Sequence, residues 1–158
     1  MAFTIEDCTG LELANSMASV AEFDTYFTDR GNTDAVALTQ AVKESLLIKG
    51  ADYLKTVFEW TGDKLVINQN MPFPRLINGA TVCTPLDIKY AQIELAFTAN
   101  DGDLLTNVGQ KVVSEQVSSI KVTYSEYSNE QLNYSAVYNL VKPYLDNSSS
   151  YSHKVVRA

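Results

Sequence analysis

The chain has 158 residues, of which 46% are hydrophobic and 20% charged, and its formal net charge is −7 at pH 7. This size and composition fit one folded domain and exclude a wholly disordered chain. Residues 1–34 alone carry −6. Because affinity for nucleic acid depends on clustered lysine and arginine, the chain as a whole is expected to repel DNA. The acidic segment is interpreted first as a solvated surface that aids solubility. The alternative is a surface along which DNA passes without binding.

No apolar run is long enough to cross a bilayer, and the first residues lack the order of a signal peptide. We therefore expect a protein that is made and kept in the cytosol. Cys8 and Cys83 could form one bridge at most, and cytosolic cysteines are normally reduced. The sequence thus predicts two small buried thiols with no chemical role.

The first predicted helix covers residues 20–30. Ser19 and Glu22 have the spacing of a capping box, in which each side chain bonds the backbone N–H of the other residue. Gly31 supplies the left-handed residue that ends the helix. Residues 32–38 are expected to add a short helical turn.

A longer helix is predicted from its cap at Thr39 to about Trp60. Its two adjacent apolar stripes are wide enough to contact more than one neighbour. As the single tryptophan, Trp60 is interpreted as a core anchor in preference to an interface residue. The stripes are Val42, Leu46, Tyr53 and Val57, and Leu47, Ala51, Leu54 and Phe58.

Helical periodicity is absent from Thr61 to Thr84, where proline, glycine and asparagine predict a long loop with short extended pieces at 65–67 and 80–83. Such a loop in a compact domain is normally functional or packed against another segment. Within it, Arg75 is either a surface residue or part of a rigid Pro-Arg turn that presents its guanidinium to a carboxylate.

The third long helix is predicted to start with Thr84 as its cap and Pro85 at the first helical position, and to end near Asn100. It is apolar on nearly all sides, so we expect it at the centre of the core. Its stripes are Leu86, Tyr90, Ile93 and Phe97, and Ile88, Ala91, Leu95 and Ala99.

A two-residue period predicts a hairpin with strands at 112–117 and 120–124. Since an isolated hairpin is marginal in water, it should pack on the helices or join strands of another subunit. A last helix is expected from about Asn133 to Leu145, where Pro143 kinks or ends it. Residues 1–145 would then form one domain, and the serine-rich residues 146–158 a flexible tail.

Residues for catalysis are missing. His153 is the only histidine and lies in the serine-rich tail, and one histidine with two distant cysteines cannot form a zinc site. The acidic residues Asp101 and Asp103 fit a plain turn better than a calcium loop, and no nucleotide-binding motif occurs. We predict no catalytic, metal-binding or cofactor-binding residue, no cofactor and no enzyme, with a carboxylate-dependent enzyme as the weakest alternative.

Short segments across most of the chain share the order and spacing of one family. They are Ile5-Glu6-Asp7, Thr9-Gly10-Leu11, Ala14-Asn15-Ser16, Ser19, Phe23 to Phe27, Asp29-Arg30-Gly31-Asn32, Ala51-Asp52-Tyr53-Leu54, Trp60 with Gly62, Gln69, Pro74-Arg75, Lys89 to Ala96, Val122 with Tyr124, and Leu140 to Leu145. Together they resemble the head-tail adaptor (connector, or head completion) proteins of tailed bacteriophages, a family also described as DnaT-like ssDNA-binding. The chain departs from it at Phe73, where the aromatic residue is often tryptophan, and in its serine-rich tail.

This resemblance implies a mainly α subunit, an adaptor-type four-helix bundle with a small β-hairpin and a long loop. It implies a ring, commonly a dodecamer, of identical subunits in the virion neck, assembled in the host cytoplasm. The implied partners are the portal protein and tail or tail-terminator (nozzle) proteins, with packaged DNA passing through the lumen without specific binding and no membrane. We expect contacts through the Thr61–Thr84 loop, the hairpin and the tail. The alternative function is a single-stranded DNA-binding module.

Overall fold

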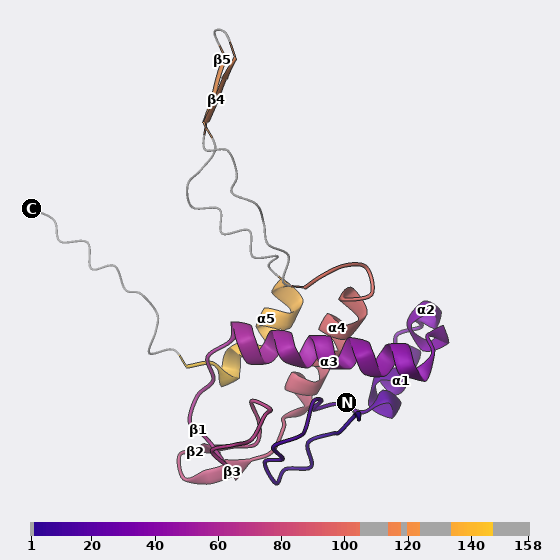
Figure 1. Ribbon diagram of the computed structural model, residues 1–158, viewed down its shortest axis with the longest axis vertical. Helices are drawn as coiled ribbons and strands as arrows, with labels where there is room; N and C mark the ends of the chain where they lie inside the picture. The colour runs from indigo at the N-terminus through magenta and orange to yellow at the C-terminus, as the bar shows by residue number, and fades with distance from the viewer. Residues whose placement is uncertain (1, 105–113, 118–119, 124–133, 147–158) are drawn as a thin grey trace, which may run out of the picture.

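The computed structural model describes residues 2–104, 114–117, 120–123 and 134–146 (Figure 1). These residues form five α-helices and two small sheets, so the predicted mainly helical class is confirmed. The short α2 makes a fifth helix beside the four expected, and a three-stranded sheet is present in addition to the hairpin. The helices are α1 (Val20–Thr28), α2 (Thr33–Ala37), α3 (Gln40–Val57), α4 (Leu86–Thr98) and α5 (Ser135–Val141), which continues into a 3-10 turn, η1 (Lys142–Tyr144). The strands are β1 (Asp63–Lys64), β2 (Arg75–Ile77), β3 (Ala80–Val82), β4 (Ser114–Val117) and β5 (Ile120–Thr123).

The predicted capping box begins α1. The Ser19 hydroxyl accepts from the Glu22 N–H at 3.1 Å, and the Glu22 carboxylate accepts from the Ser19 N–H at 2.7 Å. The helix ends two residues earlier than predicted. The N–H groups of Arg30 and Gly31 each donate to the carbonyl three residues before them, which tightens the last turn into 3-10 geometry. The Asn32 side chain then accepts from the Ala35 N–H and so caps α2. The short helical turn predicted for residues 32–38 is therefore present.

The core lies mainly between α3 and α4, which cross in close contact (Figure 1). Gly50 makes the approach possible, since a Cβ atom at this position would lie 2.6 Å from the Gln92 carbonyl oxygen. Most residues of the predicted stripes are buried, as expected. Val42 and Leu86 are exceptions: each lies in the first turn of its helix and remains exposed.

Two helix boundaries differ from the prediction. The helix α3 ends at Val57, so Trp60 follows it in extended chain, yet the ring is still part of the core. At α4 the cap is Pro85 itself, in an extended conformation, and Thr84 lies one residue outside. With φ near −65° and no N–H to satisfy, proline suits the cap as well as the first helical position.

The predicted long loop contains an antiparallel sheet in the order β1-β2-β3. The strands β2 and β3 are joined by Asn78 and Gly79, which both have positive φ and form a tight hairpin turn. The extended piece expected at 80–83 is thus nearly correct. The one expected at 65–67 is wrong, because those residues form bends and turns.

The other predicted hairpin is also present. The strands β4 and β5 pair antiparallel with Val117 opposite Ile120, and within the described ranges they form a two-stranded sheet of their own. The last helix stops where Pro143 enters η1, as predicted. Leu145 then forms an antiparallel bridge with Trp60. The tail 147–158, including His153, lies outside the described residues, and no described helix is long and apolar enough to span a membrane.

Candidate functional site

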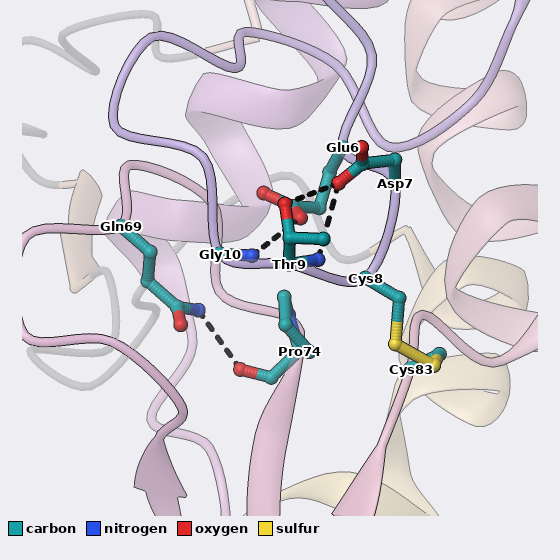
Figure 2. The surroundings of a disulfide bond; sticks show 8 residues. All are labelled: Glu6, Asp7, Cys8, Thr9, Gly10, Gln69, Pro74 and Cys83. Carbon is teal, nitrogen blue, oxygen red and sulfur yellow. Dashed lines mark hydrogen bonds between the residues drawn. A yellow bond between two sulfur atoms is a disulfide. The ribbon is translucent and has the colours of Figure 1, made fainter.

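Two segments far apart in the sequence, residues 2–18 and 58–85, pack together and are called here the disulfide-linked lobe. Cys8 and Cys83 form a disulfide, with Cα atoms 5.1 Å apart and a sequence separation of 75 (Figure 2). The prediction of two separate thiols is therefore wrong. The N-terminal segment folds back beside the end of β3, and nothing in the sequence spacing indicates this long-range contact.

The turn that carries Cys8 is organised by the buried carboxylate of Glu6. Its two oxygens accept from the backbone N–H groups of Gly10 at 2.8 Å and Leu11 at 2.9 Å. Figure 2 shows this carboxylate inside the turn, with the sulfur of Cys8 directed toward Cys83. The long loop is thus packed against another segment, as its length indicated, and that segment is the N-terminus of the same chain.

The disulfide is expected to contribute about 2–4 kcal/mol to the free energy of unfolding, because it restricts the unfolded chain over a long loop. Changing both Cys8 and Cys83 to serine should lower that free energy by this amount in urea denaturation. Reductant should lower the stability of the natural chain similarly and leave the double variant unaffected. Equal stability of the natural chain with and without reductant would contradict the prediction.

The buried guanidinium of Arg75 connects several backbone segments of the lobe by hydrogen bonds. It donates to four backbone carbonyls, those of Trp60 at 3.0 Å, Thr61 at 2.8 Å, Pro72 at 3.2 Å and Gly62. Arg75 is 8% exposed, so the interpretation as a surface residue is wrong. The alternative, a guanidinium presented to a carboxylate, is wrong as well, because its hydrogen bonds go to backbone carbonyls. Burial lowers the pKa of Arg75, and the nearby carboxylate of Asp63 acts in the opposite direction.

A second buried side chain, Gln92 of α4, connects the N-terminal segment to the helices. Its Oε1 accepts from the N–H groups of Met17 at 3.0 Å and Ala18 at 3.1 Å, while Nε2 donates to the Ser16 hydroxyl and the Leu47 carbonyl. Sequence analysis missed this residue. A signal was available, because glutamine stands four residues after Ile88 on an apolar stripe, where a polar group needs partners.

Two neighbouring turns of the lobe expose apolar side chains. The Asn70 N–H donates to the Leu11 carbonyl at 3.2 Å and its side-chain amide donates to the Ala14 carbonyl at 2.7 Å, which joins the two turns. Leu13 on one turn is 74% exposed, and Ile67 on the other is 90% exposed. Single exposed apolar residues are normal on protein surfaces, whereas large contiguous patches of them mark contact sites.

Two lysines donate to residues that follow Ile67 in the chain. The Lys55 ammonium donates to the Asn70 side chain at 2.6 Å, and the Lys64 ammonium donates to the Gln69 carbonyl at 3.0 Å. Lys55 belongs to the C-terminal half of α3.

Exposed acidic residues lie near the N-terminal end of α3. There the buried Lys43 forms an ion pair with Asp24 at 2.6 Å and donates to the Val36 carbonyl, which fixes α1 and α2 against α3. Asp29 and Asp34 remain exposed, together with Val42, which is 39% exposed.

Tyr26 of α1 links this region to α4. Its hydroxyl donates to Glu94 at 2.5 Å, and the Arg30 guanidinium lies 3.4 Å from its ring centroid. Burial, followed by the hydrogen bond to Glu94, raises the pKa of Tyr26 to about 12. The folded protein therefore holds this proton more tightly than the unfolded chain does.

Stability is accordingly expected to fall as the pH rises from about 10 to about 12, since only the unfolded chain readily loses the Tyr26 proton in that range. The Tyr26→Phe variant has no such proton and should show a shallower decline. The measurement is the free energy of unfolding at several pH values for both proteins. Parallel declines of the two proteins would contradict the assignment to Tyr26.

The described residues offer little to a nucleic acid. Of their eight basic side chains with described surroundings, Lys43 and Arg75 are buried and Lys89 pairs with Glu22 at 2.6 Å. Most described aromatic rings contact one another in the core, Trp60 among them as predicted, and Tyr138 is the exposed ring at 45%. A base-stacking groove needs exposed rings and exposed cations together.

Among the described residues, candidate catalytic groups do not assemble either. Asp101 and Asp103 lie in a turn after α4, and no cluster of three metal-ligating side chains occurs in the part of the chain that the structure describes. The expectation that no site residue performs chemistry stays a prediction.

Comparison with known proteins gives one family. No curated protein and no solved structure matches the chain. The model of the family described as "Putative DnaT-like ssDNA binding protein" matches residues 1–158. The chain belongs to this family.

Proposed function

We propose that this protein is a structural head-tail adaptor of a tailed bacteriophage, a ring-forming subunit between portal and tail that lines the DNA channel. The main support for this proposal is the negative net charge of the described residues. Residues 2–104 and 134–146 contain eight basic and sixteen acidic side chains, a net charge of −8, and three of the basic ones are buried or paired. A channel wall of this charge has few cations to bind passing phosphates.

The internal construction of the molecule supports the same proposal. Arg75 and Gln92 use their polar atoms on the chain's own backbone, and the disulfide fixes the N-terminal segment to the sheet. These contacts join the N-terminal segment, the sheet and the helices, which suits a structural subunit. The role needs no catalysis and no cofactor, and its place is the neck of the virion after assembly in the host cytoplasm.

Mass spectrometry of purified particles tests the proposal. The chain should be present in intact particles at a copy number that fits a ring, with tailless particles showing whether it stays with the head. Its absence from both kinds of particle would refute the adaptor role. Copurification with portal protein would support it.

A single-stranded DNA-binding module is the second candidate, and the family description favours it. Such a protein would bind a labelled oligonucleotide at micromolar concentrations, with an affinity that falls as salt rises. The shortage of exposed rings and free cations in the described body argues against this function. A strong, salt-dependent shift would reverse the order of the two candidates.

A further inference from the structure

We propose that Cys83 and Cys8 form a thiol–disulfide exchange site, in which the Cys83 sulfur reacts with small molecules and Cys8 completes the exchange. The substrates are low-molecular-weight disulfides such as oxidised glutathione, and the corresponding thiols in the reverse direction. The inference goes beyond the proposed function and does not depend on it, because it uses only the surroundings of the two cysteines.

The two cysteines differ in their access to solvent. Cys83 directly follows β3 and is exposed, whereas Cys8 is half-buried in its turn. The rate of thiol–disulfide exchange depends on whether the reacting molecule can reach the sulfur. The exposed cysteine is therefore the one that a small disulfide or thiol meets first.

Hydrogen bonds hold the turn around Cys8 independently of the disulfide. The Asp7 carboxylate accepts from the Thr9 N–H at 3.1 Å and from the Thr9 hydroxyl at 2.5 Å (Figure 2). The Glu6 carboxylate accepts from two further N–H groups of the same turn. Cys8 itself has a φ of 78°, which few residues with a side chain adopt. These bonds on both sides support that conformation in the reduced chain as well.

The turn is also attached to the long loop by contacts other than the disulfide. A Cβ atom at Gly10 would lie 2.8 Å from the Val66 side chain, so the two segments pack closely there. The Asn70 N–H donates to the Leu11 carbonyl at 3.2 Å. The 5.1 Å between the Cα atoms of the cysteines lies within the range of about 4.4–6.8 Å that a disulfide requires. The reduced thiols therefore remain close enough for rapid intramolecular reaction.

Oxidation of the reduced chain takes two exchange steps. First, the Cys83 thiolate attacks one sulfur of oxidised glutathione, which forms a mixed disulfide at Cys83 and releases one glutathione thiolate. The Cys8 thiolate then attacks the Cys83 sulfur, which forms the internal disulfide and releases the second glutathione. The two protein thiols lose two protons and two electrons, and one oxidised glutathione becomes two reduced molecules. Reduction of the bond follows the same steps in reverse.

The covalent link between the N-terminal segment and the sheet thus follows the thiol–disulfide ratio of the surroundings. A reducing compartment opens the bond and an oxidising one closes it. Because the hydrogen bonds of the turn and the loop persist in both states, the exchange changes the stability of the lobe and leaves its fold intact.

Single serine variants of the full chain test which sulfur reacts first. Reduced Cys8→Ser with oxidised glutathione should accumulate a mixed disulfide at Cys83, because the second thiol is missing. Cys83→Ser should form its mixed disulfide at least about tenfold more slowly, since its remaining thiol is half-buried. The natural chain should end with the internal disulfide and no bound glutathione. Intact-mass spectrometry of acid-quenched samples measures all three.

Two controls separate this order from intrinsic reactivity and from misfolding. In urea, the two serine variants should react at similar rates, because the difference in access is gone. In the natural reduced chain, limiting iodoacetamide should alkylate Cys83 before Cys8, as peptide masses show. Equal rates of the two folded variants, or earlier alkylation of Cys8, would overturn the assignment of Cys83 as the first reactant.

The positioning of Cys8 has its own test in Glu6→Gln. An amide has one acceptor oxygen where the carboxylate has two, so the turn should hold Cys8 less well. In a glutathione redox buffer the ratio of internal disulfide to dithiol should fall at least about tenfold. The control Glu12→Gln removes the same charge at an exposed position of the segment and should match the natural chain.

An unchanged ratio in Glu6→Gln would overturn the proposed positioning of Cys8 by the turn. A natural chain that retains bound glutathione at Cys83 would overturn the role of Cys8 in completing the exchange. None of these results bears on the adaptor function, which the composition of the particles tests separately.

Discussion

Replacing Arg75 with methionine is expected to lower the free energy of unfolding by about 3–5 kcal/mol, because it leaves the carbonyls of residues 60, 61, 62 and 72 without their donor. Methionine keeps much of the side-chain volume, so the loss reports mainly the hydrogen bonds. Lysine should restore little of it, since one ammonium cannot reach four carbonyls as a planar guanidinium does. Urea denaturation of the three proteins measures the difference.

The matched control is Lys49→Met, which removes one positive charge from an exposed site on α3. Its effect should stay within about 0.5 kcal/mol, as for most surface substitutions. Equal stabilities of Arg75→Met and Lys49→Met would show that the four carbonyls find water as readily as they find Arg75. The internal role assigned to this guanidinium would then be wrong.

Replacing Gln92 with methionine is expected to cost about 3–5 kcal/mol as well. The substitution fits the same space but leaves the N–H groups of Met17 and Ala18 and the Leu47 carbonyl without the partner that Gln92 provides. Because these groups belong to the N-terminal segment and to α3, the variant should loosen the attachment of the segment to the helices. Hydrogen exchange should rise first at Met17 and Ala18.

The comparison variant is Gln40→Met, at an exposed position in the first turn of α3 where the amide donates to Glu44. This change should alter stability by less than about 0.5 kcal/mol. Protection of Met17 that is unchanged in Gln92→Met would contradict the proposed attachment. A loss of stability shared equally by both variants would point to helix propensity instead.

Local signals in the sequence predict the helices well. The capping box at Ser19, the short helix after Asn32 and the stop at Pro143 depend on residues within a few positions of one another, and the structure contains all three. The hairpin at β4 and β5 follows from a two-residue period in the same way. The start of α4 differs from the prediction by one residue, because Thr84 and Pro85 are both acceptable caps and the helix begins after Pro85.

The lobe could not be predicted from such signals. Cys8 and Cys83 are 75 positions apart, and three of the four carbonyls that surround Arg75 come from a segment 13 to 15 residues before it. The roles of both depend on how the N-terminal segment and the loop fold over each other, which no short-range pattern records. Exposure at Leu13 and Ile67 is equally invisible in sequence, because the neighbouring residues do not determine whether an apolar side chain in a turn is covered by another segment.

The disulfide also determines how the chain responds to stretching. Tension applied to its two ends would pass through the Cys8–Cys83 bond, and the enclosed segment with α1, α2 and α3 could not lengthen. At full extension the sequence separation of 75 between the two cysteines represents roughly 250 Å of contour length. While that bond is intact, a pulled subunit can therefore lengthen only in the residues before Cys8 and after Cys83.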